Sequence, residues 1–503
     1  MAFTRKTADL IEEYSDSVTM IHSSWTRTPL VQVANTINGF AFKSKDFSTE
    51  NGQPLIRIRD VLRGFTETKY TGAVPDGYWV EKGDLLIGMD GDFNTTLWPS
   101  DKALLNQRVL KVEVNEKLYS KKLLHYVLPA YLGLINEYTS STTVKHLSSK
   151  TVQEITLPLP PLAEQKRIVE KLDEVLAQVD TIKARLDGIP ALLKRFRQSV
   201  LASAVSGKLT EDWRGEYGAL GQDLGLIERI KVSLINDKTV KKDLNFEISN
   251  KIFDIPDAWS FLKLKSLASK ITDGEHKTPK REESGRYLLS ARNVRDGYLS
   301  LDNVDYVGEE EYQKLRKRCD PNKGDILISC SGSVGRISLV DADDKYVMVR
   351  SAALVKVIAD FLLNSYLVYV LQSPELQKRI EESSKSTAQS NLFLGPIKEL
   401  EIPLPSIEEQ KEIVRLVDQY FAFADTIEVQ VKKAQARVDN LTQSILAKAF
   451  RGELVPQDPN DEPADKLLER IVQARKEAEA LAKTAKKAQS TKSTAKKKVA
   501  KSA

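Results

Sequence analysis

EITLPLPPLAEQKRIV (154–169) and ELEIPLPSIEEQKEIV (399–414) are two copies of one segment, 245 residues apart in the chain. The copies align without a gap over 57 positions and close on SVLASAVSGKL (199–209) and SILAKAFRGEL (444–454). They agree at 22 of these positions, where chance would give about three or four. The segment therefore indicates an internal duplication, which has to be recognised before any local structure is assigned.

Looser matches precede each copy. Trp25 corresponds to Trp259, LIRIRDVLRG (55–64) to LLSARNVRDG (288–297), and KGDLLIGMDGD (82–92) to KGDILISCSGS (323–333). The chain thus repeats a variable module followed by a constant segment. The boundaries that we predict are a lead (1–22), a first module (23–153), a first constant helical region (154–210), a linker (211–249), a second module (250–398), a second constant helical region (399–455), and a C-terminal helix with a lysine-rich tail (456–503).

Each constant segment has the apolar seam of a coiled coil, with apolar residues in alternating steps of four and three. The first seam is Ile168, Leu172, Val175, Val179, Ile182, Leu186, Ile189, Leu193, Phe196 and Val200, and the second is Ile413, Val417, Tyr420, Ala424, Ile427, Val431, Ala434, Val438, Leu441 and Ile445. Each run predicts a helix of about 45 residues, or about 65 Å, ended by Gly207 and Gly452.

The seams are expected to pack on each other. A whole module separates the two helices in the chain, so an antiparallel pair would place the modules at opposite ends of a rod, related by a pseudo-two-fold axis. Pro190 lies inside the first helix, and because the heptad phase continues through it we expect a bend rather than a break. The alternative is that both helices are ordinary core helices of one large domain.

Each module is expected to be α/β (α+β), with short strands such as PLIRIRDV, DLLIGM and RVLKVEV bounded by Gly, Asp and Pro. A helix is predicted at 120–138 in the first module and at 364–383 in the second. The small polar loops that follow (139–149 and 383–395) suit backbone or hydroxyl contacts to phosphate.

Composition and charge narrow the class of protein. With 41% hydrophobic residues in 503, the chain can build cores, and it lacks the run of about 18 apolar residues that a membrane span needs. Two cysteines and four scattered histidines offer neither a disulfide framework nor a zinc site, and we expect a cytoplasmic protein. The net charge is +5, but eight lysines from Lys483 onward leave the rest of the chain at −3. Overall basicity is therefore no argument for DNA binding.

Catalytic motifs are missing from the sequence. There is no phosphate-binding loop, no G-x-S-x-G and no H-E-x-x-H. Asp257 with Glu275 and Lys277 matches the spelling of metal-dependent nucleases, whose carboxylates gather around Mg²⁺. Gly274 interrupts any strand before Glu275, and the first module has no equivalent. The sequence is therefore interpreted as that of a chain without catalytic activity.

The helical segments, LPLPPLAEQKRIVEKLDEVLAQVDTIKARLDGIPALLKRFRQSVL and QARVDNLTQSILAKAFRGEL, resemble the conserved regions of the specificity (S) subunits of type I restriction–modification enzymes, the HsdS family, and especially its enterobacterial type IA group. The resemblance covers nearly the whole chain in order and is weak only within the modules. It implies two target-recognition domains, each reading one half of a bipartite, asymmetric DNA sequence.

The resemblance also implies partners in a bacterial cytoplasm. Two modification subunits would dock on the conserved regions and methylate adenine with S-adenosylmethionine. Two restriction subunits would use ATP and Mg²⁺, so this chain itself would bind no cofactor and no metal. The residues at the start of each conserved region are the candidates for partner binding: Pro158, Pro160, Glu164, Gln165, Pro403, Pro405, Glu409 and Gln410.

Candidate DNA contacts are polar residues in loops or at strand ends of the modules, because Arg and Lys bond to guanine and Asn to adenine. In the first module they are Lys43, Lys45, Arg57, Arg59, Arg63, Asn94 and Thr95. In the second they are Lys277, Lys280, Arg281, Arg292, Asn293, Ser331, Ser333 and Arg336. Arg59 and Arg292 occupy equivalent positions. Two other functions stay open: a two-headed coiled-coil scaffold that binds proteins, and an autonomous metal-dependent endonuclease.

Overall fold

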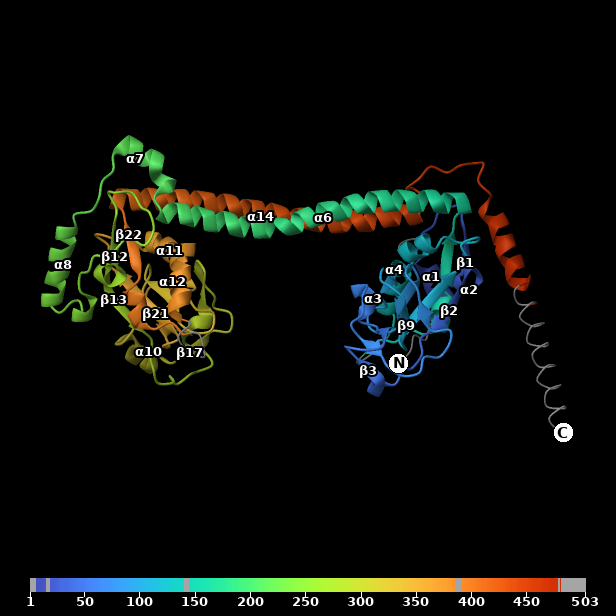
Figure 1. The fold of residues 1–503 in the computed structure, drawn as a ribbon, viewed down its shortest axis with the longest axis horizontal. Coiled ribbons are helices and arrows are strands. Elements are labelled where there is room, and N and C mark those ends of the chain that lie inside the picture. Colours follow the sequence, from blue (N-terminus) through green and yellow to red (C-terminus); the bar gives the residue numbers. More distant parts are fainter. Residues whose placement is uncertain (1–5, 15–18, 140–143, 385–390, 478–479, 481–503) are drawn as a thin grey trace. The chain divides into compact units, whose positions relative to one another are not determined.

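The computed structural model describes residues 6–14, 19–139, 144–384, 391–477 and 480. The chain divides into two compact units, Met1–Arg185 with Ala434–Ala503, and Leu186–Lys433 (Figure 1). Each unit holds one module and a part of each long helix. No described helix is both long enough and apolar enough to cross a membrane.

The first module is built on three sheets. β1 (Thr26–Pro29) pairs antiparallel with β11 (Thr156–Leu159), so the strand that starts the module lies beside the strand that leaves it. A second sheet has the order β2-β10-β7-β8 and a third the order β3-β5-β4-β9-β6. Their bounds are β2 (Ala34–Asn38), β3 (Phe47–Ser48), β4 (Gln53–Ile56), β5 (Lys69–Tyr70), β6 (Trp79–Val80), β7 (Leu85–Gly88), β8 (Thr95–Leu97), β9 (Ala103–Leu105) and β10 (Val109–Val114).

The second module repeats this plan. β12 (Ser260–Lys263) pairs antiparallel with β22 (Glu401–Leu404), and a four-stranded sheet has the order β13-β21-β18-β19. The other strands form the sheets β17-β14-β20 and β15-β16. Their bounds are β13 (Ala268–Asp273), β14 (Arg286–Leu289), β15 (Val294–Arg295), β16 (Tyr298–Leu299), β17 (Asp305–Val307), β18 (Ile326–Ser329), β19 (Ile337–Leu339), β20 (Tyr346–Met348) and β21 (Ala352–Val357). The predicted fold class, two α/β modules in tandem, is confirmed.

Short helices link these strands and cover them. They are α1 (Thr7–Glu13), α2 (Leu30–Val33), α3 (Asp60–Arg63), α4 (Lys121–Glu137), α5 (Ser149–Gln153), α7 (Glu211–Tyr217), α8 (Leu224–Asn236), α9 (Leu264–Leu267), α10 (Glu309–Arg316), α11 (Asn364–Gln372), α12 (Pro374–Ser384) and α13 (Leu394–Lys398), with 3₁₀ turns η1 (Ser44–Asp46), η2 (Lys208–Thr210), η3 (Lys242–Leu244) and η4 (Ala291–Asn293). The helix predicted at 364–383 is two helices, because Ser373 is extended and Pro374 begins a new helix.

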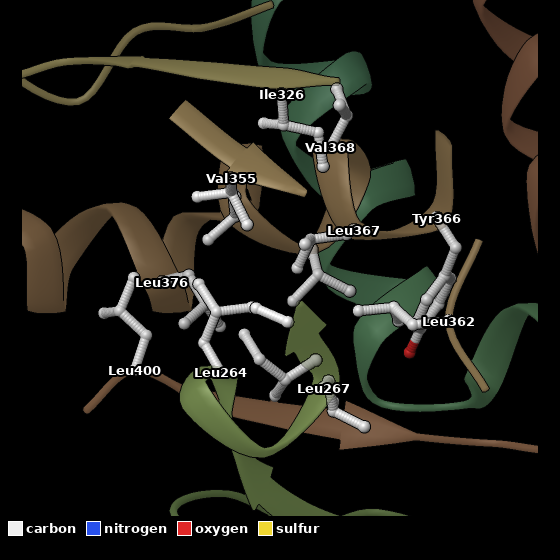
Figure 2. Close-up of a cluster of buried hydrophobic side chains, with 14 of the residues drawn as sticks. Leu264, Leu267, Ile326, Val355, Leu362, Tyr366, Leu367, Val368, Leu376 and Leu400 are labelled. Atoms are coloured by element: carbon white, nitrogen blue, oxygen red, sulfur yellow. The ribbon is translucent and has the colours of Figure 1, made fainter. Parts of the chain in front are cut away.

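The core of the second module lies between its four-stranded sheet and the helices α9 and α11. Ile326 and Val355 from neighbouring strands face Leu367 of α11 and Leu264 of α9 (Figure 2). Each of these four side chains is fully buried, and burial of apolar surface stabilises a fold by about 25 cal/mol per Å². The core therefore fixes the strand ends on which the polar loops of this module are mounted.

The two constant regions form helices of equal length, α6 (Leu162–Val205) and α14 (Ile407–Phe450), of 44 residues each. The residues after them, Gly207 and Gly452, have φ of +74° and +72°, the left-handed conformation that ends many helices. Pro190 lies within α6, which continues through it as one helix.

The long helices run antiparallel within each unit. In the first unit Lys183 Nζ lies 2.9 Å from Asp439 Oδ1, while Arg167, earlier in α6, pairs with Asp461, beyond the end of α14. In the second unit Arg197 of α6 pairs with Asp425, and Thr210, further on, bonds to Glu409, near the start of α14. The predicted antiparallel pairing is confirmed.

The seam between the helices is only partly sealed. Ile168, Leu172, Ile413 and Val417 are fully buried, but Ile182 and Leu441, also seam positions, are 45% and 48% exposed. Two helices alone leave part of an apolar stripe uncovered, because the stripe spans more than the contact line. Other seam positions, among them Val179, Leu193 and Val431, are buried, so the exposed part of the seam is local.

Segments outside the repeated modules also join the cores. Leu10 and Ile11 of α1 are buried in the first unit together with Leu467 and Ile471 of the helix 464–477. The segment 211–249, predicted as a linker, folds onto the second unit through α8, where Ile227 is 1% exposed. The lysine-rich tail from residue 481 onward lies outside the described residues.

Candidate nucleic-acid interface

Four of the predicted DNA contacts of the second module meet in one cleft. The serine–arginine cleft, about 460 Å³ in volume, is lined by Ser290, Ala291, Arg292, Arg295, Ser331, Gly332, Ser333, Arg336 and Ser351. Its lining contains three arginines, four serines and no carboxylate. Guanidinium and hydroxyl groups are the donors that bind phosphate oxygens and base edges.

One wall of the cleft is the turn after β18. Buried Ser329 holds it from beneath: its Oγ donates to the carbonyl of Ser333 at 2.5 Å and accepts from the backbone N–H of Arg336 at 2.9 Å. Gly332 and Gly335 have φ of +69° and +85°, which side-chain-bearing residues rarely adopt. The turn therefore has a fixed shape, and it leaves the side chain of Ser333 exposed.

The opposite wall is η4 after β14. Asn293 caps this turn: its Oδ1 accepts from the backbone N–H of Ser290 at 2.9 Å, and its Nδ2 donates to the carbonyl of Ser300 at 3.0 Å. Asn293 has 0% exposed area, so the prediction that it reads a base is corrected. Its amide has a structural role, while its neighbour Arg292 is exposed on the cleft.

The remaining predicted contacts of this module lie on the segment after β13. Lys277, Lys280 and Arg281 are exposed there and do not line the cleft. Arg281 Nε lies 3.1 Å from Asp305 Oδ2, the oxygen that also accepts Arg292 Nη2 at 2.7 Å. Arg281 is therefore connected to the cleft through a shared carboxylate.

In the first module the predicted contacts are spread over three elements. Lys43 and Lys45 are exposed at η1, whereas Asn94 and Thr95 lie at the start of β8 and are partly buried. Around α3, Arg57 lies over the ring of Phe47 at 5.9 Å, Arg59 Nε lies 3.7 Å from Asp60 Oδ1, and Arg63 is exposed. The three arginines lie in or beside α3, and Arg57 reaches Phe47, the residue that follows η1.

Sequence reasoning missed Arg295, Ser290 and Ser351 in the cleft. Arg295 could have been predicted from the sequence, because ARNVR (291–295) places a second arginine three residues after Arg292. Ser351 follows β20 by only a few residues and gave no signal of its own. The parallel pairing of β14 with β20 brings Ser351 beside Ser290.

The residues predicted to bind partners form an internal network instead. All eight are buried: Pro158, Pro160, Glu164, Gln165, Pro403, Pro405, Glu409 and Gln410. Trp25 Nε1 donates to Glu164 Oε2 at 3.0 Å, and in the other unit Trp259 Nε1 donates to Glu409 Oε2 at 2.8 Å. The duplicated tryptophan and glutamate thus fasten the start of each module to the start of its long helix.

The adjoining glutamine repeats this fastening. The backbone N–H of Ser120 donates to Gln165 Oε1, and that of Leu363 donates to Gln410 Oε1, both at 2.8 Å. The carbonyls of Pro158 and Pro403 accept from Tyr119 and Tyr366 at 3.0 and 2.8 Å. These buried groups contact the chain itself, so a partner that docks here has to bind the exposed residues around them.

The two networks differ in the group that completes them. Glu409 accepts from Arg214 Nη1 at 2.5 Å and Thr210 Oγ1 at 2.7 Å, both just beyond α6. Glu164 accepts from Gln457, just beyond α14, and burial raises its pKa. One carboxylate therefore has a cationic partner, and the other has only neutral donors apart from the more distant Arg167.

The residues that match the nuclease pattern, Asp257, Glu275 and Lys277, do not form a described carboxylate cluster that could hold a metal ion. Asp257 is fully exposed and lies 3.5 Å from Lys251 Nζ. The backbone N–H groups of Lys277 and His276 hold the pKa of Glu275 below its usual value, because they donate to its carboxylate within the turn. Among the described residues, no three His, Cys, Asp or Glu side chains are grouped so that they could hold a metal ion.

A duplicated α/β module with divergent polar loops, attached to a pair of antiparallel helices, defines a pseudo-dimeric recognition protein. The family described as "Type I restriction modification DNA specificity domain" matches residues 22–191 and 256–435. The chain is 45% identical to the type I restriction enzyme EcoBI specificity subunit of Escherichia coli, over 94% of this chain and 97% of that one. It is 30% identical to the EcoKI specificity subunit of Escherichia coli strain K12, over 90% and 95%. The chain belongs to the family of type I restriction enzyme specificity subunits.

Solved structures agree in fold. A chain from a structure on complex assembly and conformational transition of the type I R-M system has a TM-score of 0.57 at 18% identity, covering 86% of this chain and 99% of that chain. The HsdS subunit from Thermoanaerobacter tengcongensis has a TM-score of 0.51 at 17% identity, covering 87% and 100%. At this identity the likeness establishes the architecture and leaves the surfaces to be argued from this chain.

Proposed function

We propose that this chain, as the DNA-specificity subunit of a type I restriction–modification complex, reads a bipartite, asymmetric DNA target with one half assigned to each module, and that it performs no chemistry itself. The observation that carries this proposal is the repetition of one scaffold with unlike polar surfaces. Four-stranded sheets of the same order carry an acidic turn in the first module (Asp90 and Asp92) and the serine–arginine cleft in the second. Equal scaffolds with unlike surfaces suit two unlike half-sites.

The serine–arginine cleft supports double-stranded DNA as the ligand of the second module. Arginine forks bond bidentately to guanine, and serine hydroxyls bond to phosphate or to either kind of base edge. The first module would use Arg57, Arg59 and Arg63 near α3 together with Lys43 and Lys45. The long helices would set the length of the unread spacer between the half-sites.

Two modification subunits and two restriction subunits are the proposed protein partners, in the bacterial cytoplasm. The partly open seam near Ile182 and Leu441 supports helical partners, because exposed apolar residues at helical spacing bind a further helix. S-adenosylmethionine, ATP and Mg²⁺ are assigned to those partners, which would carry out methylation, translocation and cleavage.

A footprint on DNA with the modification subunit present tests this proposal. We expect two short protected blocks separated by an unprotected spacer. Protection of no DNA would support a protein scaffold instead, and cleavage of DNA by this chain alone with Mg²⁺ would support a nuclease. Either of those results would overturn the proposed function.

A further inference from the structure

Asp305 connects two arginines at the rim of the serine–arginine cleft. Its Oδ2 lies 2.7 Å from Arg292 Nη2 and 3.1 Å from Arg281 Nε. Both arginine side chains are about half exposed, at 52% and 51%, while that of Asp305 is 29% exposed. One carboxylate oxygen therefore fixes the direction of two guanidinium groups that solvent, and a DNA duplex, can reach.

The backbones of all three residues are held in place. Asp305 lies on β17 in register with Leu288 of β14, and the backbone N–H of Glu282, next to Arg281, donates to the carbonyl of Tyr306 at 2.9 Å. Arg292 lies in η4, whose capping box is formed by Ser290 and Asn293. Because these backbones are fixed, the ion pairs decide only where the two guanidinium groups point.

Stability does not account for this arrangement. Ion pairs between half-exposed side chains add little to folding, because they are solvated and lose side-chain entropy when they form. A free arginine has many rotamers, whereas bidentate bonding to a guanine edge needs a set orientation of its fork. Holding Arg292 before DNA arrives reduces the entropy that binding has to overcome.

We propose that Asp305 is a positioning residue for sequence recognition: it orients Arg292, with Arg281 beside it, so that Arg292 discriminates one base pair of the second half-site. This inference rests on the proposed function and names the residues that act in it. The two guanidinium groups and one carboxylate keep a net charge of +1, so the group still attracts the DNA backbone. Asp305 therefore sets which base pair is accepted, while it slightly weakens general attraction to DNA.

The test uses Asp305→Asn in the full chain, assembled with its modification subunit. Methylation rates are measured with S-adenosylmethionine on the mapped target duplex and on duplexes with single substitutions at each position of both halves. We expect discrimination at one position of the second half to fall at least about fivefold, with discrimination in the first half unchanged. Binding to duplex of unrelated sequence should stay equal or become tighter, since one negative charge is removed.

Two further variants separate orientation from charge and from folding. Asp344→Asn is the matched control, because Asp344 pairs with Arg316 at 2.9 Å outside the cleft, and it should change no position. Arg292→Lys keeps the positive charge but loses the fork, so it should relax the same position as Asp305→Asn.

Wild-type discrimination at every position in Asp305→Asn would overturn the inference. So would an equal loss on all duplexes, including those altered in the first half, since that loss indicates general damage. If the wild-type complex methylates no defined sequence, the proposed function fails as well. If it methylates a bipartite target that Asp305→Asn reads unchanged, only this inference fails.

Discussion

Replacing Glu409 by alanine should destabilise the second unit more than replacing Glu164 destabilises the first. The two glutamates occupy equivalent positions, are both fully buried, and both accept from a duplicated tryptophan. They differ in that Glu409 also accepts from Arg214, whose side chain is 13% exposed. The two substitutions therefore compare, within one chain, a buried carboxylate that has a cationic donor with one that has neutral donors.

The magnitudes follow from the groups left without an acceptor. Glu409→Ala strands the Arg214 cation and the Trp259 N–H, and removing one partner of a buried ion pair costs about 3–5 kcal/mol. Arg214 keeps its bond to the carbonyl of Gly207, which favours the lower end, about 3 kcal/mol. Glu164→Ala strands the neutral donors of Trp25 and Gln457, and we expect a cost of about 1–3 kcal/mol.

Hydrogen exchange in increasing urea is the suitable assay, since a chain of two units need not unfold in one step. The amides of 207–214 and 407–413 report on the Glu409 network, and those of 162–168 and 452–461 report on the Glu164 network. We expect Glu409→Ala to lower protection only in the first set and by the larger free energy. An equal or larger loss for Glu164→Ala would refute the argument from buried charge.

Three further predictions concern single residues. Lys231 is fully buried, and burial lowers its pKa from 10.5 to about 8. Between these two pH values the unfolded state binds more protons than the folded state, so the stability of the second unit should rise by up to about 3 kcal/mol from pH 8 to 10.5. Urea unfolding at each pH measures this rise, which should be absent in Lys231→Met. Gly452→Ala should lower the thermal unfolding temperature more than Gly77→Ala does. Both glycines have positive φ, but only a Cβ at position 452 would meet a neighbouring atom, His22 Cβ at 2.7 Å. An equal lowering by the two substitutions would exclude this clash. If Arg336 contacts phosphate, Arg336→Ala should weaken binding of the complex to all duplexes alike and reduce the magnitude of the slope of log K against log salt by about 1. A loss of binding confined to one sequence would show instead that Arg336 reads a base.

Regular features of the fold could be predicted because they are repeated in the sequence. The duplication and the heptads of α6 and α14 each have a period, and β7 and β18 are short runs that are buried along their whole length. Gly207 and Gly452 marked the helix ends through the conformation that only glycine adopts easily. The four predicted residues that meet in the serine–arginine cleft came from the loops after β14 and β18, two strands that belong to different sheets.

What could not be predicted depends on burial and on contacts distant in the chain. Asn293 is chemically a good adenine reader, and only its cap in η4 shows that its amide is occupied. Glu164 and Glu409 are charged residues in the first turn of a helix, where exposure is usual, yet each is buried under a tryptophan about 140–150 residues earlier in the chain.

The segment 211–249 contains a short match to the sequence of the helix that follows α14. LGLIERI (224–230) and DKLLERI (465–471) share the letters ERI, and both lie beyond the end of a long helix. In the structure Ile227 and Lys231 are buried in the second unit, and Leu467 and Ile471 are buried in the first. The shared letters pair Ile227 with Leu468 and Lys231 with Val472, so the buried positions of the two helices are offset by one residue. Because one of the buried residues of α8 is a lysine, apolar periodicity alone does not mark this helix as part of the core.

Mapping methylated adenines across the genome of cells that carry this chain and its modification subunits tests most directly whether one chain reads two unlike half-sites. The proposed function predicts one asymmetric motif of two short blocks around a spacer of constant length, with a methylated adenine in each block. Replacing residues 250–398 by the module of a relative should change one block and leave the other as it was. A single continuous motif, or a change in both blocks on this replacement, would contradict the account.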